Sequence, residues 1–350
     1  MTLRKRLTGL KALRDGSSAP LPLTKRLKAW RHGFSGWTWL LYDLDNNDPR
    51  QYVPDRLSSR MAAIDGPIAR SVLKNKLLFE KVVGRHVRVP KVYGAIERGG
   101  LTSLREDFTP RSVDDLVRWV VDSETGVFVK PIDSSEGHGV ISLEARGGDL
   151  LVDKRPSDVV AASRLVASQN GSLVSELITQ GQFGRSIFAD SVNTMRVITM
   201  IDPDDHTPFI AAAIYRFGTK KSAPTDNVSR GGIRTAIDTR TGQMGVGMAS
   251  WAYENGEFLR FPVHPESGAA IEGVTVPHWQ EVVDTLLGVV KRFPMLHYVG
   301  WDAVMGDDEV ILIEGNHSPN IVQQVTGPYL ADTRMRRFIE SHGVLEGTGL

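Results

Sequence analysis

Two oxygen-donor side chains end an apolar run near the C-terminus. Residues 311–313 are followed by Glu314 and, two residues later, Asn316. Strand side chains alternate with period two, so these two are expected to share a face. A further acid, Asp302, precedes a turn signal at residues 306–308, which predicts a hairpin with Asp302 roughly opposite Ile313 and Glu314. Such hard oxygen donors suit magnesium, although acids and amides are also common turn and cap residues.

A second chemical segment lies far upstream. Lys130 closes an apolar strand, and a polar loop with Ser134, Ser135, Gly137 and Gly139 follows. Glycines allow close backbone approach, and successive N–H groups can form an anion nest beside the lysine. The segment is not a P-loop, because GxxxxGK[ST] is absent. A plain hairpin loop is the alternative, but magnesium held by few carboxylates usually accompanies nucleotide phosphates.

Helices and strands that must position these groups follow one another along the chain without a regular β-α-β alternation. Periodicity and turn signals indicate an α+β protein with mainly antiparallel sheets rather than a doubly wound fold. Ser112 is the expected N-cap of one helix. The expected helices cover residues 61–82, 113–121, 156–167, 278–293 and 328–342. The expected strands cover residues 87–95, 127–131, 139–144, 150–153, 172–178, 194–201, 208–217, 232–238 and 245–251.

Composition bounds the class of protein. The chain has 350 residues, is 41% hydrophobic, and carries a formal net charge of +1, so nothing global favours nucleic acid. The absence of cysteine excludes disulfides, thiolate metal sites and cysteine nucleophiles. No apolar run reaches the length of a membrane-spanning helix, and nothing resembles a signal peptide. We therefore expect a cytoplasmic protein.

Charge is concentrated at the start of the chain. Residues 1–32 contain nine Lys or Arg and one acid, Asp15, while the remainder is acidic overall. Such a basic head is suited to anionic lipid or polysaccharide, and a helix-packed terminus with solvated charges is the alternative. Aromatic residues follow between positions 30 and 42. They predict a helical lead-in that packs onto the main body.

The order of several short segments resembles the ATP-grasp superfamily, and within it the sugar-transfer-associated branch related to α-L-glutamate ligases. The resemblance covers roughly residues 33–340. It rests on Gly33-Phe34-Ser35, Tyr42-Asp43-Leu44, Asn75-Lys76, Lys130-Pro131, Asn193-Thr194-Met195-Arg196, Asn227 with Gly231-Gly232, and Glu314-Gly315-Asn316-His317-Ser318-Pro319.

The resemblance implies a fold in which two α+β subdomains clamp ATP behind a helical and aromatic N-terminal extension. The implied divisions are an extension at residues 1–60, an N-terminal region at 61–125, a lid subdomain at 126–180 and a C-terminal subdomain at 181–345.

The resemblance also implies roles in nucleotide binding. Lys130 and Lys76 would contact phosphates, and Ser134, Ser135, Gly137 and Gly139 would form a lid over them. Residues 174–178 match the strand that pairs with adenine, so Leu177 and Ile178 are expected beside the base. Glu176 would lie near adenine or ribose, with Gln180 or Gln182 as alternatives for the ribose.

The remaining implied roles concern the transferred phosphoryl group and the substrate. Arg196 would contact the γ-phosphate or an acyl phosphate, as a guanidinium fork suits charge on several oxygens. Asp302, Glu314 and Asn316 would bind one or two magnesium ions. A polar segment at residues 227–234 is either a substrate loop or an ordinary hairpin. The candidate substrate contacts are Asn193, Asn227, Arg230, Gly231, Gly232, Arg234, His317 and Asn320, with Arg230 or Arg234 suited to a carboxylate.

The implied activity is that of an ATP-grasp ligase of the EC 6.3 type. ATP would convert a small-molecule carboxylate to an acyl phosphate, and an amine would displace phosphate to form an amide. Two alternatives stay open: a phosphotransferase acting on a sugar or glycan-linked substrate, and a non-catalytic nucleotide-binding partner in polysaccharide assembly. The acid, the acceptor, the pathway and the oligomeric state do not follow from the sequence.

Overall fold

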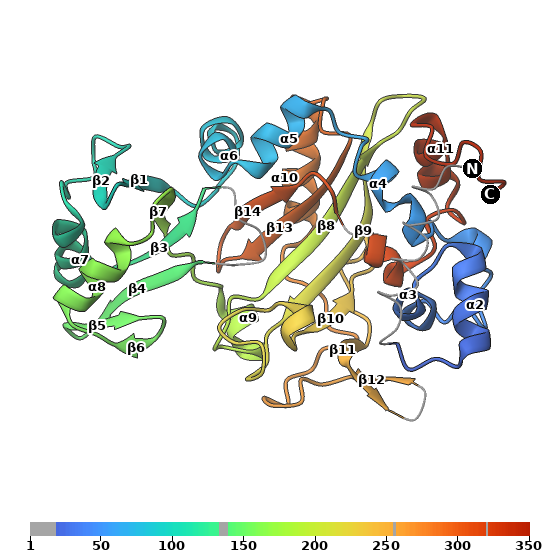
Figure 1. Ribbon diagram of the computed structural model, residues 1–350, viewed down its shortest axis with the longest axis horizontal. Coiled ribbons are helices and arrows are strands. Elements are labelled where there is room, and N and C mark those ends of the chain that lie inside the picture. Colours follow the sequence, from blue (N-terminus) through green and yellow to red (C-terminus); the bar gives the residue numbers. More distant parts are fainter. Residues whose placement is uncertain (1–18, 133–138, 255–256, 320) are drawn as a thin grey trace. The chain divides into compact units, whose positions relative to one another are not determined.

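The structure is a computed structural model that describes residues 19–132, 139–254, 257–319 and 321–350. The chain divides into two compact units (Figure 1). Unit 1 comprises residues 1–69, 182–303 and 316–350, and unit 2 comprises residues 70–181 and 304–315. Each unit is built on one seven-stranded sheet. The strand pairings are antiparallel in the described residues, which agrees with the mainly antiparallel sheets predicted.

The sheet of unit 2 has the strand order β2-β1-β7-β3-β4-β5-β6. Its strands are β1 (Val92–Glu97), β2 (Gly100–Ser103), β3 (Gly126–Pro131), β4 (Ile141–Arg146), β5 (Asp149–Val152), β6 (Arg155–Pro156) and β7 (Ser172–Glu176). The division expected between residues 125 and 126 falls inside this sheet, because β7 pairs with both β1 and β3. The segments before and after it therefore share one unit.

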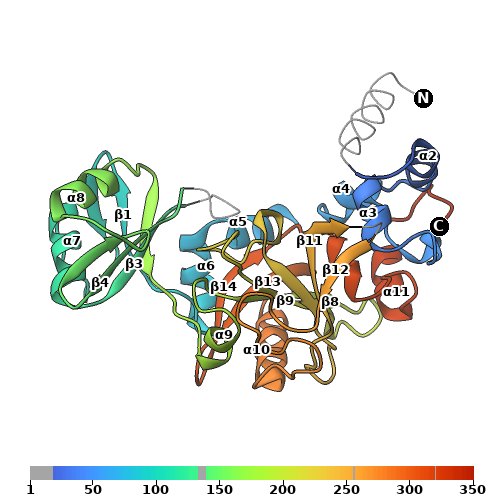
Figure 2. The same cartoon turned by 90° about the horizontal axis from the view of Figure 1, so that it is seen from below.

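Two helices pack side by side on this sheet (Figures 1 and 2). They are α7 (Val113–Asp122) and α8 (Val159–Ala167). The side chain of Ser112 accepts a hydrogen bond from Asp115 N, which confirms the expected N-cap. Buried residues of both helices and of β3 and β4 form the core, which fixes the strand that ends in Lys130.

The helix expected over residues 61–82 is broken into shorter pieces. The structure has α4 (Ser58–Met61), α5 (Pro67–Lys74) and α6 (Lys76–Val82), followed by the 3₁₀ turn η4 (Val83–Arg85). Pro67 begins α5, and the Asn75 side chain accepts hydrogen bonds from Leu77 N and Leu78 N to start α6. The restart places Lys76 at the first position of a helix.

The sheet of unit 1 has the strand order β12-β11-β10-β9-β8-β13-β14. Its strands are β8 (Thr194–Ile201), β9 (Pro208–Phe217), β10 (Ile233–Ala236), β11 (Gly247–Glu254), β12 (Glu257–Phe261), β13 (Tyr298–Met305) and β14 (Val310–Asn316). The expected bounds of β8 and β9 are confirmed. Residues 304–315, which comprise the end of β13 and all of β14 except Asn316, group with unit 2.

One long helix contacts the middle of this sheet (Figure 2). It is α10 (Trp279–Arg292), which packs on β8 and β9 through a buried stripe that includes Val282, Leu286 and Val289. The short α9 (Gln182–Ile187) and the 3₁₀ turn η5 (Val228–Arg230) lie in the connections before β8 and β10. No helix in the described part of the chain is long and apolar enough to cross a membrane.

The two terminal regions of the chain also belong to unit 1. The N-terminal part contains α2 (Leu23–His32), α3 (Gly36–Leu41), η2 (Pro49–Gln51) and η3 (Asp55–Leu57). The C-terminal part contains η6 (Ile321–Thr326) and α11 (Thr333–Ser341). Phe34, Trp39, Tyr42 and Tyr52 form an aromatic core, which agrees with the helical and aromatic lead-in expected there. A second core joins residues 53–61, β8, β13 and α11.

Candidate functional site

A half-buried lysine lies at the end of β3 in unit 2. The Lys130 side chain is close enough to Lys76 and Glu314 for their charges to act on it. Desolvation, reinforced by repulsion from Lys76, lowers the pKa of Lys130 to about 8, although Glu314 opposes the shift. Lys76 N also donates a backbone hydrogen bond to Ile132 O at 3.3 Å. Two ammonium groups that share one carboxylate favour binding of a polyanion.

The predicted glycine loop is only partly described. Ser134, Ser135 and Gly137 lie outside the described residues. Gly139 has φ +71°, in the left-handed region that favours glycine, and a Cβ there would lie 3.2 Å from Pro131 Cγ. Gly139 therefore has a conformational reason to be glycine, and its role in a lid stays a prediction.

Glu176, at the end of β7, lies at a polar cavity of unit 2. The cavity has a volume of about 510 Å³ and is also lined by Arg88 and by residues 177–181 and 306–309. Glu176 accepts hydrogen bonds from Arg88 Nη2 at 2.5 Å and from Lys91 N at 3.1 Å. Arg88 also pairs with Glu309 at 3.4 Å. Glu176 is thus held by Arg88, a residue that no sequence motif marks.

The strand end expected beside adenine lines the same cavity. Leu177 and Ile178 border it, together with Gln180. Leu177 N already donates to Gly126 O at 3.2 Å, and Glu176 N donates to Lys91 O at 2.8 Å. These two backbone N–H groups therefore serve the protein's own hydrogen bonds and are not available to a base.

Arg196 and Asp302 form the centre of a buried ion-pair network in unit 1. The two residues are Cα partners across β8 and β13. Arg196 binds both carboxylate oxygens of Asp302, with Nη2 at 2.9 Å from Oδ2. Arg216 from β9 adds a contact at 3.0 Å to Oδ2. Burial opposes ionisation of Asp302, but the two guanidinium groups outweigh it and lower its pKa to about 2.

A second buried acid completes this network. Asp226 lies 3.5 Å from Arg216 Nε and accepts a hydrogen bond from Thr194 N at 2.9 Å. Burial raises the pKa of Asp226, with Arg216 and Thr194 opposing the rise. Neither Arg216 nor Asp226 was predicted, because no local motif marks them. The pairing of β9 with β8 brings Arg216 to Arg196, and Asp226 reaches the network from the loop that follows β9.

Asn193, predicted as a substrate contact, has a structural role instead. Its Nδ2 donates to Gly184 O at 2.9 Å and Phe188 O at 2.8 Å. Its Oδ1 accepts from Gly218 N at 3.0 Å and Ser191 Oγ at 3.1 Å. The side chain is fully buried, and its amide is saturated by the protein, so it anchors the start of β8.

The polar segment at residues 227–234 separates into exposed and buried parts. Asn227 caps η5 by accepting from Ser229 N at 2.9 Å, and Arg230 is exposed. Gly231 has φ +123°, and a Cβ on Gly232 would lie 2.4 Å from Asp226 O. Both glycines therefore allow a tight turn against Asp226. Arg234, by contrast, is only 7% exposed on β10.

The C-terminal cluster keeps its expected strand positions. Glu314 and Asn316 lie two residues apart on β14, and β14 neighbours β13, which carries Asp302. Asn316 Nδ2 donates to Gly300 O at 3.3 Å. His317 is half-buried, and Asn320 lies outside the described residues. In the described ranges, no group of three or more His, Cys, Asp or Glu side chains is arranged to hold a metal ion. The predicted set is not of this kind, because it combines two carboxylates with the amide of Asn316.

Several solved structures are similar to the chain at low sequence identity. D-alanyl-alanine synthetase A from Vibrio cholerae is 12% identical, with 80% of this chain and 63% of that chain covered and a TM-score of 0.43. An L-amino acid ligase from Bacillus licheniformis is 10% identical over 79% of this chain and 49% of that chain, with a TM-score of 0.41.

A biotin carboxylase from Campylobacter jejuni is 9% identical over 80% of this chain and 48% of that chain, with a TM-score of 0.47. This chain thus spans less than two thirds of each of these three structures. No curated protein matches the sequence.

The family comparison covers most of the chain. The model for sugar-transfer associated ATP-grasp proteins matches residues 67–337, which include both sheets and every described candidate site residue. The two antiparallel α+β units agree with the fold that the motif order implied. The chain belongs to the sugar-transfer-associated ATP-grasp family.

Proposed function

We propose that the protein is an ATP- and magnesium-dependent ligase that joins a carboxylate to an amine through an acyl phosphate. The observation that carries the proposal is the network of Asp302 with Arg196 and Arg216. Two fixed guanidinium groups, held in place by Asp302 and Asp226, make a preorganised array of hydrogen-bond donors. Such a site stabilises negative charge as it develops on a transferring phosphoryl group.

The cationic group at Lys130 supports the nucleotide part of the proposal. Lys130 and Lys76 repel one another, and this repulsion is relieved when phosphate oxygens bind between them. Phosphate binding would also restore the pKa of Lys130 toward its ordinary value. Glu176 and the cavity beside Arg88 supply a polar surface for the base and ribose of the same nucleotide.

The available donors suit magnesium. A pKa of about 2 keeps Asp302 ionised at neutral pH, and its two arginine partners use only part of its lone-pair capacity. Glu314 and Asn316 add hard oxygen donors from one strand. We therefore propose Asp302, Glu314 and Asn316 as the ligands. A bound magnesium ion would neutralise charge on the phosphate oxygens.

The proposed reaction has two steps. An oxygen of the substrate carboxylate attacks the γ-phosphorus of ATP, and the bond to ADP breaks. The nitrogen of the amine then attacks the acyl carbon, loses a proton, and displaces inorganic phosphate. Arg196 and Arg216 would hold the phosphoryl oxygens in both steps. No enzyme nucleophile is required, which agrees with a chain that has no cysteine.

Product analysis tests this proposal. Purified protein is incubated with ATP, magnesium and a panel of carboxylic acids and amines, and the nucleotide products are separated. We expect ADP and inorganic phosphate in amounts equal to the amide formed. In the presence of hydroxylamine we expect a hydroxamate of the acid. Formation of AMP and pyrophosphate would contradict the acyl-phosphate route, and a stable phosphorylated product without free phosphate would identify a phosphotransferase.

A further inference from the structure

Arg234 is a buried cation without a counter-ion in the described part of unit 1. Its side chain is 7% exposed, and its Nε has no hydrogen-bond partner there. Desolvation lowers its pKa to about 10, so the guanidinium remains charged at neutral pH. A buried charge without a partner costs folding free energy, and binding of an anion removes that cost.

The strand register places Arg234 beside the candidate site. Arg234 on β10 is the Cα partner of Arg216 on β9, which is the Cα partner of Thr194 on β8. Since side chains alternate along each strand, these residues share a sheet face with Arg196, two residues beyond Thr194. Arg216 is neutralised by Asp302 and Asp226. Its neighbour Arg234 forms no ion pair with an acid among the described residues.

The N-terminal extension supplies the surroundings of Arg234. Tyr42 follows α3, is buried, and has its hydroxyl hydrogen-bonded to Gln324 and within electrostatic range of Arg234. Tyr298 and Tyr329 are near Tyr42 as well. The hydroxyls of both are buried without a hydrogen-bond partner in the described residues. The group therefore contains three polar atoms in need of partners: Arg234 Nε and two tyrosine hydroxyls.

We propose that Arg234 binds the carboxylate of an acidic small-molecule substrate, and that Tyr42 of the extension forms part of that site. The unpaired Nε–H is a donor only, and a planar guanidinium matches a carboxylate through two parallel hydrogen bonds. That the bound carboxylate belongs to a substrate rests on the proposed ligase function. Anion binding itself does not.

Thermal unfolding in anion-free buffer, and then with succinate or inorganic phosphate, tests the site without any turnover. We expect succinate to raise the melting temperature of the wild-type protein with increasing concentration. Phosphate is expected to act more weakly, which would distinguish a carboxylate site from a general phosphate site. Stabilisation by phosphate alone would overturn the carboxylate assignment.

Two substitutions of Arg234 make the result specific. Arg234→Met removes a buried charge without a partner, so the variant is expected to melt no lower than wild type in anion-free buffer and to lose the succinate effect. Arg234→Lys keeps the charge but lacks the planar fork, and is expected to weaken succinate binding by about tenfold. Arg260→Met, an exposed arginine in the same row of the sheet, is the matched control and should change neither property.

Three results would overturn the proposal. They are a lower melting temperature of Arg234→Met without anions, an unchanged succinate effect in both Arg234 variants, and no effect of succinate on the wild type. Nucleotide binding by the same variants separates this proposal from the ligase proposal, because Arg234→Met should bind ATP as the wild type does. If ATP binds and succinate does not, only the anion site fails.

A different surface carries a second inference. Leu23, Leu27 and Trp30 on α2 are 69%, 46% and 46% exposed, and their spacing of four and three residues puts them on one face of the helix. Arg26 and Arg31 flank this apolar stripe on its two sides, and α2 contains no acid. Large apolar side chains bordered by arginines are typical of helices that lie on anionic bilayers.

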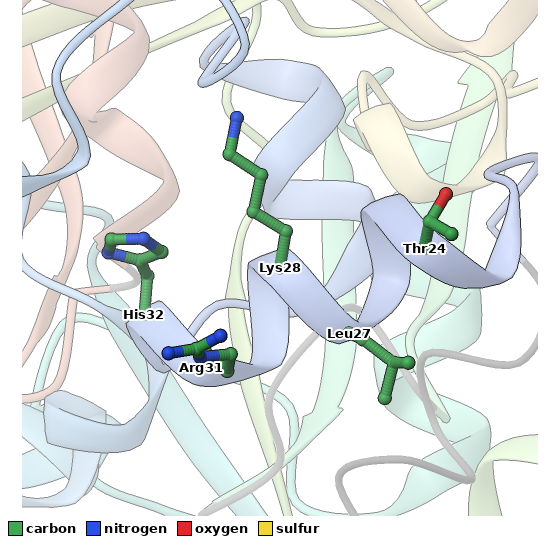
Figure 3. A pocket seen from close by; sticks show the side chains of 5 residues that line it. All are labelled: Thr24, Leu27, Lys28, Arg31 and His32. Carbon is green, nitrogen blue, oxygen red and sulfur yellow. The ribbon is translucent and has the colours of Figure 1, made fainter.

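The opposite face of α2 is held by the protein. Lys25 and Lys28 pair with Asp45 at 2.8 and 3.5 Å, and Lys28 Nζ lies 5.2 Å from the Trp39 ring centroid. Figure 3 shows Lys28 and Leu27 projecting in different directions from the helix, beside Arg31 and His32. The anchored face thus fixes the orientation of the apolar stripe, and we infer that this stripe contacts the surface of a membrane containing anionic lipids.

Vesicle co-sedimentation tests the α2 surface. The full-length protein is expected to sediment with phosphatidylcholine vesicles that contain phosphatidylglycerol, and not with phosphatidylcholine alone, and high salt should weaken the binding. The double variant Leu27→Asp, Trp30→Asp should lose it. Ile68→Asp, at another exposed apolar residue of unit 1, is the control. Equal binding of the double variant, or binding to anionic polysaccharide but not to vesicles, would overturn the inference.

Discussion

Asp302 on β13 lies directly opposite Arg196 on β8, and their side chains form a two-pronged ion pair that Arg216 joins from β9. The antiparallel register alone brings together residues 106 positions apart. The Asp302 carboxylate, which we propose as a magnesium ligand, therefore also holds Arg196, the arginine proposed for phosphoryl transfer. Substitutions at this position act on the fold and on the chemistry together.

Asp302→Asn should lower the free energy of unfolding as well as activity. Two buried guanidinium groups would lose their counter-charge, and breaking one side of a buried ion pair costs about 3 kcal/mol. Urea unfolding followed by tryptophan fluorescence measures the loss. A variant as stable as wild type would show that the ion pairs do not hold β8 to β13.

Glu314→Gln separates catalysis from stability more cleanly. Glu314 is half-buried near the end of β14, and amide substitution retains its shape. We expect an unchanged melting temperature, at least a tenfold loss of turnover, and a higher magnesium requirement, since an amide binds the ion less tightly than a carboxylate. Magnesium titration of turnover is the measurement. An unchanged requirement would remove Glu314 from the metal site.

The Lys130 pKa predicts how nucleotide affinity depends on pH. The Lys130 ammonium loses its proton near pH 8, so ATP affinity should fall as the pH rises from 7 to 9.5. Lys130→Arg, which stays charged, should lose most of this dependence. Binding calorimetry with a non-hydrolysable ATP analogue at several pH values tests it, and equal pH profiles for the two proteins would contradict the assignment.

The free energy of unfolding should depend on the protonation of Lys130 as well, but it should rise with pH where ATP affinity falls. The pKa of Lys130 falls from 10.5 to about 8 on folding, so between these values the unfolded chain binds more protons than the folded one. The contribution of Lys130 to the free energy of unfolding therefore rises as the pH rises from 8 toward 10.5. Comparing wild type with Lys130→Met by urea unfolding at both pH values isolates it. A difference that falls with pH would be contrary to expectation.

Asn193→Ala should impair folding rather than substrate binding. The substitution leaves four buried protein groups without their hydrogen-bond partner. Each buried polar group left unsatisfied lowers the free energy of unfolding by about 1 to 3 kcal/mol. We expect a clearly lower melting temperature with KM for each substrate unchanged in the folded fraction. A raised KM without loss of stability would restore the substrate role first predicted for Asn193.

Gly300→Ala tests how the 317–319 segment is positioned. A Cβ on Gly300 would lie 2.8 Å from Pro319 Cβ and 3.1 Å from Arg196 Cδ. The methyl group must displace one of these neighbours, so activity should fall by more than stability does. Comparison of kcat with melting temperature decides this. Full activity would show that Pro319 moves away at no cost to the site.

The sequence was sufficient to predict those strands and helices whose limits are set by local residue patterns. Strands β8 and β9 were delimited correctly because each is an apolar run bounded by polar or proline residues, and α7 because Ser112 caps it. The helix over residues 61–82 was predicted without its breaks, since its apolar spacing hides the cap at Asn75.

Long-range partners did not follow from the sequence. Arg88, Arg216 and Asp226 carry no motif. Arg216 reaches Asp302 through strand pairing, whereas Arg88 reaches Glu176 and Asp226 reaches Arg216 from loops. Asn193 was assigned to substrate because its motif resembles that of a family, whereas its burial and four hydrogen bonds depend on residues 184–191 and on Gly218. Burial of Arg234 likewise depends on β10 lying inside a sheet.

Isotope transfer from the substrate acid tests the central claim most directly. Once the product screen identifies an acid, its carboxylate is labelled with ¹⁸O and the inorganic phosphate released during amide formation is analysed by mass spectrometry. An acyl phosphate requires one labelled oxygen to appear in phosphate for each amide formed, with ADP as the nucleotide product. Unlabelled phosphate, or label recovered in AMP, would contradict the account.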